Sequence, residues 1–348
     1  MSKKKSITKK RSEKKRAAVI LLTLAALIAA GITAFSVSPW PAALLIRVSF
    51  DRGSDKTAAA LAKHVPAGVS SVLNLRYDPE GTDTFLDVYY PSEAEGTRRT
   101  YPTIVWVHGG GWLSGNKGQI SNYAQILAAA GYTVAAAGYS IAPEAVYPTP
   151  LIQINKALAF LAEAGPDLHA DPDFLILAGD SAGAHIAAQV ACVITSPAYA
   201  EELGIVPLIK PSALAGTILY CGTYDTSMVD FSGPMSGFLR TLLWAYMGNK
   251  DFLSDPRFAA ASVIGYVTPD FPPSFISAGN GDPLAPHSYA FAEKLTGLGV
   301  TAETLFFAAD FTPPAGHEYQ FNLDTGAGQR ALEKSLDFLD RLGNENSE

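Results

Sequence analysis

Charged residues are scarce in this 348-residue chain, and the basic ones are unevenly placed. Charged residues make up 17% of the sequence and hydrophobic residues 48%, a balance that suits a packed core and excludes a disordered chain. The first 16 residues hold nine Lys or Arg and one acid, so of the net charge of −7 this tail carries +8 and the remainder −15. An acidic body has no basic footprint for nucleic acid, and we expect no nucleic-acid partner. The length fits one large α/β domain with insertions as well as two small domains.

Cysteine is nearly absent, and no internal repeat or low-complexity tract stands out beyond the basic tail. The two cysteines are Cys192 and Cys221. Outside the cytoplasm they could form a disulfide, and as buried free thiols they would be equally compatible with the sequence. The sequence leaves both alternatives open.

Residues 17–37 contain no charged side chain. At about 1.5 Å per residue a helix of this length spans roughly 30 Å, the thickness of a bilayer core, and the preceding basic run favours a cytoplasmic N-terminus. We therefore predict a basic cytoplasmic tail over residues 1–16, a single-pass transmembrane anchor over residues 17–37 and a body outside the cytoplasm, at the cell membrane. The alternative is a signal peptide, whose cleavage would release a secreted body.

Beyond residue 70 short apolar segments alternate with helical segments. Strands that alternate with helices of about 10–15 residues predict an α/β fold with a mostly parallel sheet covered on both faces. The predicted domain spans residues 70–343. Strands are predicted at residues 85–90, 103–107, 133–137, 174–178, 214–221, 274–278 and 301–307. Helices are predicted at residues 120–130, 151–164, 182–193, 288–298 and 331–342.

Two segments fall outside this alternation. Residues 38–69 predict a pair of juxtamembrane cap helices, at 42–46 and 58–62, bracketed by prolines. Residues 224–268 carry many aromatic and apolar side chains between two core strands, and predict a lid insertion or, as an equal alternative, a long crossover with an amphipathic helix. An apolar substrate pocket is expected from Trp112, Phe231, Phe238 and Trp244.

The pentapeptide Gly179-Asp180-Ser181-Ala182-Gly183 follows one predicted strand directly and precedes a predicted helix. A sharp strand-to-helix turn would hold the serine hydroxyl above the sheet, and glycines let the neighbouring backbone approach. The helix N-terminus adds free N–H groups. We therefore predict that Ser181 is a nucleophile.

A second motif, His108-Gly109-Gly110-Gly111-Trp112, follows the strand at 103–107. Ester hydrolysis develops negative charge on the carbonyl oxygen, and backbone N–H donors in a glycine loop can reach it without side-chain interference. We predict that the oxyanion is bound by the N–H groups of Gly109, Gly110 and Ala182, and that His108 orients the loop.

A base and an acid are expected after the serine, in the order Ser, acid, His. Of the six histidines, His317 alone lies in a loop between the last strand and the last helix, where the base belongs. Asp282 follows the strand at 274–278, and we predict that it is the acid that orients the imidazole. Asp310, at the start of the His317 loop, is the main rival of Asp282, and Asp270 and Glu318 are further candidate acids. His287 is the other candidate for the base.

These motifs resemble the hormone-sensitive-lipase-like branch of α/β-hydrolase carboxylesterases, which carries His-Gly-Gly-Gly and Gly-Asp-Ser-Ala-Gly sequences. Residues 139–144, Tyr-Ser-Ile-Ala-Pro-Glu, resemble that family's Tyr-Arg-Leu-Ala-Pro-Glu, and Glu318-Tyr319 depart from the Gly-Phe found in many members. The resemblance covers roughly residues 70–343. It implies an α/β-hydrolase fold with a small cap, and an esterase that acts on short to medium acyl chains without a cofactor.

The sequence therefore predicts a serine carboxylesterase with a Ser181–His317–Asp282 triad, an acyl-enzyme intermediate and a small-molecule ester as substrate. No metal is expected. Two alternatives remain, an amidase or peptidase on the same fold and a catalytically inactive, membrane-tethered binding protein. The oligomeric state and the natural ester do not follow from the sequence.

Overall fold

An eight-stranded sheet forms the centre of the protein, seen in a computed structural model that describes residues 2–345, with side chains described from residue 13 to residue 344. The strand order is β1-β2-β4-β3-β5-β6-β7-β8. The β1–β2 and β2–β4 pairs are antiparallel and the others parallel, so the predicted mostly parallel sheet is present. The strands are β1 Val69–Arg76, β2 Phe85–Pro91, β3 Tyr101–Val107, β4 Thr133–Ala137, β5 Ala170–Asp180, β6 Leu214–Tyr220, β7 Ser274–Ala278 and β8 Ala302–Phe306.

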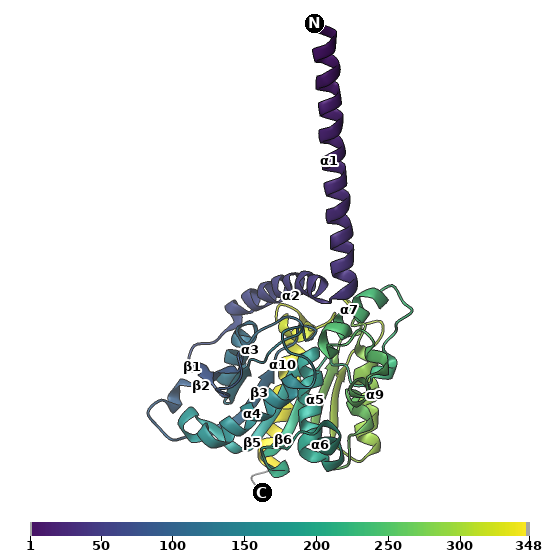
Figure 1. Ribbon diagram of the computed structural model, residues 1–348. Helices are drawn as coiled ribbons and strands as arrows, with labels where there is room; N and C mark the ends of the chain where they lie inside the picture. The colour runs from purple at the N-terminus through teal and green to yellow at the C-terminus, as the bar shows by residue number, and fades with distance from the viewer. Residues whose placement is uncertain (1, 346–348) are drawn as a thin grey trace.

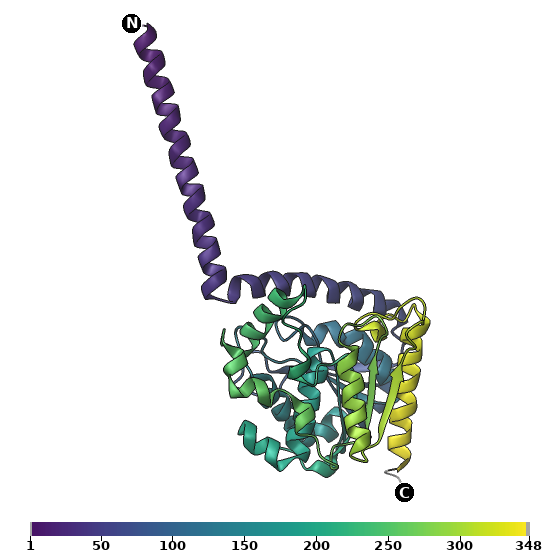
Figure 2. The same cartoon turned by 90° about the vertical axis from the view of Figure 1, so that its right-hand side faces the viewer.

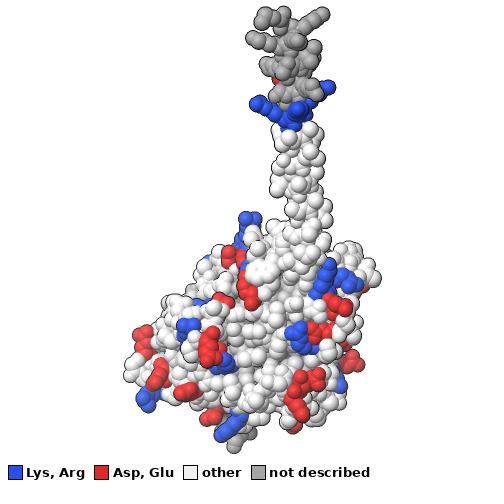
Figure 3. Space-filling view, in the orientation of Figure 1, with Lys and Arg blue, Asp and Glu red and all other residues white. Residues whose placement is uncertain are grey.

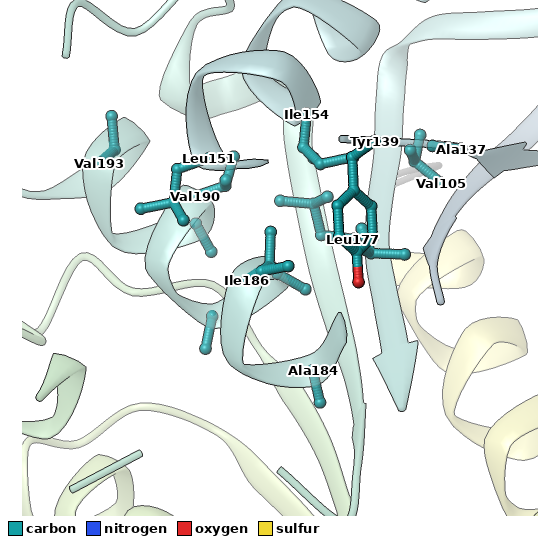
Figure 4. Close-up of a cluster of buried hydrophobic side chains, with 14 of the residues drawn as sticks. Val105, Ala137, Tyr139, Leu151, Ile154, Leu177, Ala184, Ile186, Val190 and Val193 are labelled. Atoms are coloured by element: carbon teal, nitrogen blue, oxygen red, sulfur yellow. The ribbon is translucent and has the colours of Figure 1, made fainter. Parts of the chain in front are cut away.

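Helices cover both faces of the sheet (Figure 1). One core joins the sheet to α4, α5 and α9, and Figure 4 shows part of it, with Leu177 of β5 against Ile186 of α5. The other core joins the sheet to α3 and α10. The helices are α1 Ser2–Val37, α2 Trp40–Leu61, α3 Lys117–Ala129, α4 Thr149–Ala164, α5 Ala182–Thr195, α6 Pro197–Leu203, α7 Ser236–Met247, α8 Pro256–Ala260, α9 Ala285–Gly297 and α10 Gly326–Glu345.

The central strands are buried on both faces, which explains their unbroken apolar sequences. In β3, Val105 and Val107 belong to the core under α5, while Ile104 and Trp106 belong to the core under α3. A strand covered on both sides has no polar face to present to water, so periodicity in its sequence disappears.

Strand β1, Val69–Arg76, was not among the predicted strands. It is an edge strand, hydrogen-bonded only to β2 in the described sheet, and its residues are exposed or half-buried throughout. Its sequence, VSSVLNLR, is correspondingly polar and bulged between Val72 and Leu75. A weakly buried edge strand lacks the apolar run by which the central strands are identified.

The predicted pair of cap helices is wrong, because residues 40–61 form the single helix α2. Pro41 stands in its first turn, where proline's missing N–H costs no hydrogen bond. The helix continues through Gly53 because its inner face is held by the body: Arg47 Nε donates to Leu113 O at 2.7 Å, and Asp51 Oδ1 accepts the Gly115 N–H at 3.0 Å. Tertiary contacts here outweigh the helix-breaking tendency of glycine.

Helix α1 rises away from the body, and α2 begins at the base of α1 and runs along the surface of the body (Figures 1 and 2). Residues 13–37 of α1 are the one segment in the described part of the chain that is long and apolar enough to cross a membrane, with a mean hydropathy of 2.5. Most of the predicted basic tail, residues 1–12, has side chains outside the described residues.

The segment 224–268 contains α7, α8 and three short 3₁₀ turns. Helix α7 packs against α2 beside the base of α1 (Figure 1). The two helices meet through the rings of Phe50 and Phe238, whose centroids are 6.0 Å apart. Segments far apart in sequence thus lie together over the carboxyl ends of the strands.

Candidate active site

Ser181 stands between β5 and α5 in a strained backbone conformation, with φ 52° and ψ −119°. The turn is possible because both flanking glycines lie against backbone. A Cβ on Gly179 would lie 2.6 Å from the carbonyl carbon of Gly183, and one on Gly183 would collide with Val107 O and His108 O. The predicted strand–serine–helix turn is therefore present, and the Ser181 N–H is held by Tyr220 O at 2.8 Å.

The structure brings His317 and Asp282 to this serine. His317 Nε2 lies 2.9 Å from Ser181 Oγ, and His317 Nδ1 lies 3.0 Å from Asp282 Oδ2. Asp282 follows β7 and its side chain is fully buried, while the loop after β8 carries His317. Asp282 Oδ1 also accepts the Leu284 N–H at 2.8 Å, which fixes the carboxylate in place. The arrangement can move a proton from the hydroxyl to the imidazole while the acid holds the ring.

Charge and burial act in opposite directions on these two groups. Burial alone would raise the pKa of Asp282, but the hydrogen bond from His317 and its charge hold that pKa below its ordinary value. Burial alone would lower the pKa of His317, but the hydrogen bond to Asp282, followed by the neighbouring Cys221, raises it well above its ordinary value. The acid therefore stays ionised and favours the imidazolium.

The other candidate for the base, His287, and His185 on α5 are engaged elsewhere. His185 is buried, its Nε2 lies 2.9 Å from Ala261 O, and burial lowers its pKa to about 4. Burial also lowers the pKa of His287, whose Nδ1 accepts from the N–H groups of Tyr224 and Asp225 at 3.4 Å. Neither ring bonds to Ser181 among the described contacts.

The glycine loop, His108–Trp112, requires a correction. The Gly109 N–H donates to Asp180 Oδ2 at 2.8 Å, so it is already paired and cannot serve an oxyanion. In the described residues no protein acceptor takes the N–H of Gly110, Gly111 or Ala182. Gly110 and Gly111 both have positive φ, 106° and 59°, which glycine adopts without strain. The free donors are thus those of Gly110, Gly111 and Ala182.

The buried ring of His108 holds the glycine loop in place. The ring is stacked on Tyr139 with centroids 4.2 Å apart, and Nδ1 lies 2.9 Å from Gly109 O. Burial lowers the pKa of His108 to about 4, so the ring is neutral near pH 7. The Tyr139 hydroxyl donates to His108 O at 2.8 Å. These contacts agree with an orienting role and give His108 no bond to Ser181.

Two acids that the sequence reasoning did not single out as a pair lie beside the loop. Asp180 Oδ1 accepts the Trp106 Nε1–H at 2.7 Å, and Glu318 Oε1 lies 3.9 Å from His317 Nε2. Burial and the nearby Glu318 raise the pKa of Asp180 well above its ordinary value. Asp180 and Glu318 line a small pocket with Gly109, Gly110 and three residues of α2. The one available signal was Glu318 itself, which stands where many family members have glycine.

The predicted pocket aromatics divide into two groups. Trp112 is buried and stacks on Tyr246 at 4.6 Å, so it belongs to the core. Phe231 packs on Phe252, and Trp244 lies under Lys250, so both belong to the packing of the 224–268 segment. Of the three aromatics outside the loop, only Phe238 packs against a residue beside it, Phe50. Phe50 and Leu242 are the side chains nearest to Gly111, at 3.2 and 3.1 Å from the position of a Cβ there, and neither was predicted.

Both cysteines are free and buried. The Cys221 sulfur lies with the ligand atoms of Asp282 and His317, all within 4.8 Å of one another. Such a trio has metal-ligand chemistry, but burial raises the pKa of the Cys221 thiol to about 11 and the other two groups already bond to each other. We assign no metal to them.

Comparison with known proteins adds the family. Residues 86–295, more than half of the chain, match the BD-FAE family. The chain belongs to the BD-FAE family. This BD-FAE protein is 28% identical over 270 residues to Esterase LipQ of Mycobacterium tuberculosis, covering 76% of the chain and 61% of LipQ. It is 28% identical over 235 residues to Carboxylesterase NlhH of the same species, covering 64% of the chain and 68% of NlhH. It spans less than two thirds of LipQ.

The fold of this BD-FAE protein is that of solved esterases. Esterase B from Lactobacillus rhamnosis superposes with a TM-score of 0.75 at 25% identity, covering 88% of the chain and 96% of esterase B. An esterase from Pyrobaculum calidifontis superposes with a TM-score of 0.67 at 22% identity, covering 86% and 91%. The predicted α/β-hydrolase fold, and the predicted kinship with hormone-sensitive-lipase-like esterases, are confirmed.

Proposed function

We propose that this protein is a carboxylic ester hydrolase that acts through an acyl-enzyme on Ser181. The observation that carries the proposal is the continuous relay from Ser181 Oγ through His317 to the buried Asp282, with steps of 2.9 and 3.0 Å. Esterases among its relatives and structural neighbours support the same chemistry.

The proposed reaction has two stages. Ser181 Oγ attacks the ester carbonyl carbon while His317 Nε2 takes the hydroxyl proton, and the N–H groups of Gly110, Gly111 and Ala182 bind the oxyanion. His317 then returns the proton to the leaving alcohol, and the acyl group remains on Ser181. Water, deprotonated by His317, releases the acid and restores the serine.

Short to medium acyl esters are the proposed substrates. One structure of the Lactobacillus esterase B contains a C4-C4 tributyrin phosphonate, an analogue of a triester with short chains. Phe50, Phe238 and Leu242 supply apolar surface beside the glycine loop of this chain. No cofactor is required by the proposed steps.

The body is proposed to work at the outer face of the cell membrane, held by residues 17–37 as a single-pass anchor with residues 1–16 in the cytoplasm. The apolar stretch of α1, none of which is buried in the body, supports an anchor. A cleaved signal sequence is the alternative, and the size of the mature chain in membrane and medium fractions distinguishes the two. In this proposal residues 38–69 and the segment 224–268 act as cap and lid of the domain at 70–343.

The test is ester turnover by the full chain and by Ser181→Ala, with Ser212→Ala, at an exposed serine just before β6, as a matched surface control. Loss of a triad member typically lowers kcat by about 10⁴-fold or more, and the control should retain the parent rate. Full activity of Ser181→Ala on p-nitrophenyl butyrate would overturn the mechanism. A parallel panel of amides tests the amidase or peptidase alternative, and no turnover of either panel would favour an inactive binding protein.

A further inference from the structure

The outward face of α2 changes from apolar to cationic along its length. Trp40, Leu44, Leu45 and Val48 are all exposed, from 42% for Trp40 to 65% for Leu45. Residues four apart lie above one another on a helix, so the row through Leu44 and Val48 continues to Arg52 and Lys56, which are also exposed. Within the described part of the chain neither Arg52 nor Lys56 forms an ion pair. The cations therefore face outward beside the apolar end.

This apolar end of α2 adjoins the candidate membrane span. Only Ser38 and Pro39 separate α1 from α2. Figure 2 shows α1 rising from the side of α2 that faces away from the body. Figure 3 shows a band of Lys and Arg side chains on α1 and, between this band and the body, a visible face without charged side chains. A bilayer crossed by α1 would therefore begin at the outward face of α2.

We propose that the outward face of α2 lies in the surface of the bilayer that holds α1. Trp40, Leu44, Leu45 and Val48 would lie at the boundary of headgroups and acyl chains, where amphipathic helices bury their apolar side chains and where tryptophan is enriched. Arg52 and Lys56 would reach lipid phosphates, their apolar stems lying along the interface. The occupant of this face is therefore a lipid surface with anionic headgroups.

The inward face of α2 contacts the glycine loop, which places the active site close to that surface. Phe50 approaches Gly111, and Asp51 binds the Gly115 N–H. Helix α7 also contacts both the glycine loop and α1. Its Leu242 approaches Gly111, and Lys250, just after α7, donates to Ser36 O of α1 at 2.6 Å. The two helices that cover the loop are thus both attached to the base of α1.

The substrate class follows, and this step rests on the proposed function. An ester that reaches Ser181 past α2 and α7 comes from the side of the molecule that faces the bilayer. The substrates should then be acyl esters dissolved in the membrane, such as acylglycerols, presented to the site at high local concentration. Water-soluble esters remain usable but lack this advantage.

The first test measures the environment of α2 directly. The full chain, as Leu45→Cys, is labelled with bimane in nanodiscs of phosphatidylcholine and phosphatidylglycerol, since both native cysteines are buried. Val206→Cys is the matched control, because Val206 is a 73% exposed apolar residue that follows α6 closely in the sequence, and α6 lies at the end of the body opposite α1 (Figure 1).

Lipid-borne nitroxide should quench the label at position 45 and aqueous iodide should not, with the reverse at position 206. Quenching of position 45 by iodide to the same degree as position 206 would overturn the docking. Protection of position 45 from both quenchers would also overturn it, because the face would then be covered by protein, for example a second copy of the chain.

The second test concerns the substrate class and separates it from the proposed function. Leu45→Glu/Val48→Glu and the control Val206→Glu are compared on a bilayer-embedded diacylglycerol and on p-nitrophenyl butyrate. The ratio of the first rate to the second should fall about tenfold or more in the double variant, equivalent to about 1.4 kcal/mol, and stay unchanged in the control. An unchanged ratio in both variants would overturn the substrate class. Absence of all turnover in the parent chain would instead overturn the proposed function, leaving the quenching result to decide the docking.

Discussion

Asp180 accepts the N–H of Gly109 at 2.8 Å and so joins the glycine loop to β5, the strand that ends at Asp180 directly before Ser181. Its second oxygen accepts the Trp106 indole N–H at 2.7 Å. One buried carboxyl group therefore positions two parts of the candidate site that lie 71 residues apart in the sequence.

Asp180→Asn should lower both the stability of the protein and its rate of ester hydrolysis. The amide has one acceptor oxygen, so its NH₂ group must face either the Gly109 N–H or the Trp106 N–H. A buried donor left without an acceptor costs about 1–3 kcal/mol. We expect lower Tm and lower kcat/KM on p-nitrophenyl butyrate.

A double-mutant cycle with Trp106→Phe checks this reason. In the double variant the NH₂ group can turn toward the phenylalanine, and the oxygen can still accept from Gly109. The combined loss should therefore be smaller than the sum of the two single losses. Additive losses would show that the two hydrogen bonds to Asp180 are not the cause.

Gly110→Ala should remove most activity. Gly110 has a φ of 106°, and a Cβ there would collide with the Ser114 carbonyl, so the loop must move. Displacing an oxyanion donor typically lowers kcat by about 10²–10³-fold. The matched control is Gly96→Ala, at a φ of 71° with no atom near the added Cβ, and it should retain the parent kcat. Equal kcat values for the two variants would remove Gly110 from the oxyanion site.

The rate should rise with pH through the titration of His317. The base must be neutral to accept the Ser181 proton, and the pKa of His317 is raised well above its ordinary value, which is about 6.5. Below that raised pKa the imidazolium predominates and kcat/KM should fall tenfold per pH unit. Asp282→Asn should shift the acidic limb to lower pH as well as lowering the rate. A kcat/KM that is flat from about pH 5 to 8 would contradict a histidine base.

Arg47 should hold α2 on the body. Its guanidinium forms two bonds to the Glu144 carboxylate, at 2.7 and 2.6 Å, and donates to Leu113 O and Ala142 O. Arg47→Ala should cost about 2 kcal/mol of stability, because two carbonyls and one carboxylate lose a charged donor. Arg98→Ala is the control, since the Arg98 side chain is 87% exposed and lies 3.8 Å from Asp167; surface pairs of this kind contribute little. Equal Tm values for the two variants in the same detergent would contradict the role of Arg47.

The local sequence was enough to predict a residue's position in the site where that position depends only on the strand that the residue follows. The turn at Ser181, the position of His317 after the last strand and that of Asp282 after β7 are all of this kind. The succession of strands and helices along the domain follows from the same alternation, except for β1, whose exposed edge lacks an apolar pattern, and the short helix α6.

Contacts between distant segments could not be predicted in this way. The glycine motif identifies the loop, but the direction of the Gly109 N–H depends on Asp180, a side chain from another strand. Likewise α2 remains one helix because Arg47 and Asp51 bind backbone groups 64 or more residues away. The residues beside Gly111, Phe50 and Leu242, come from two helices that only the tertiary structure brings together.

The most direct test of the central claim is covalent labelling of the full chain with a fluorophosphonate, followed by peptide mass mapping. A single adduct on Ser181 is expected, absent in Ser181→Ala and formed far more slowly in His317→Ala, because the relay activates that hydroxyl alone. An adduct on another residue, or labelling that persists in Ser181→Ala, would contradict Ser181 as the nucleophile.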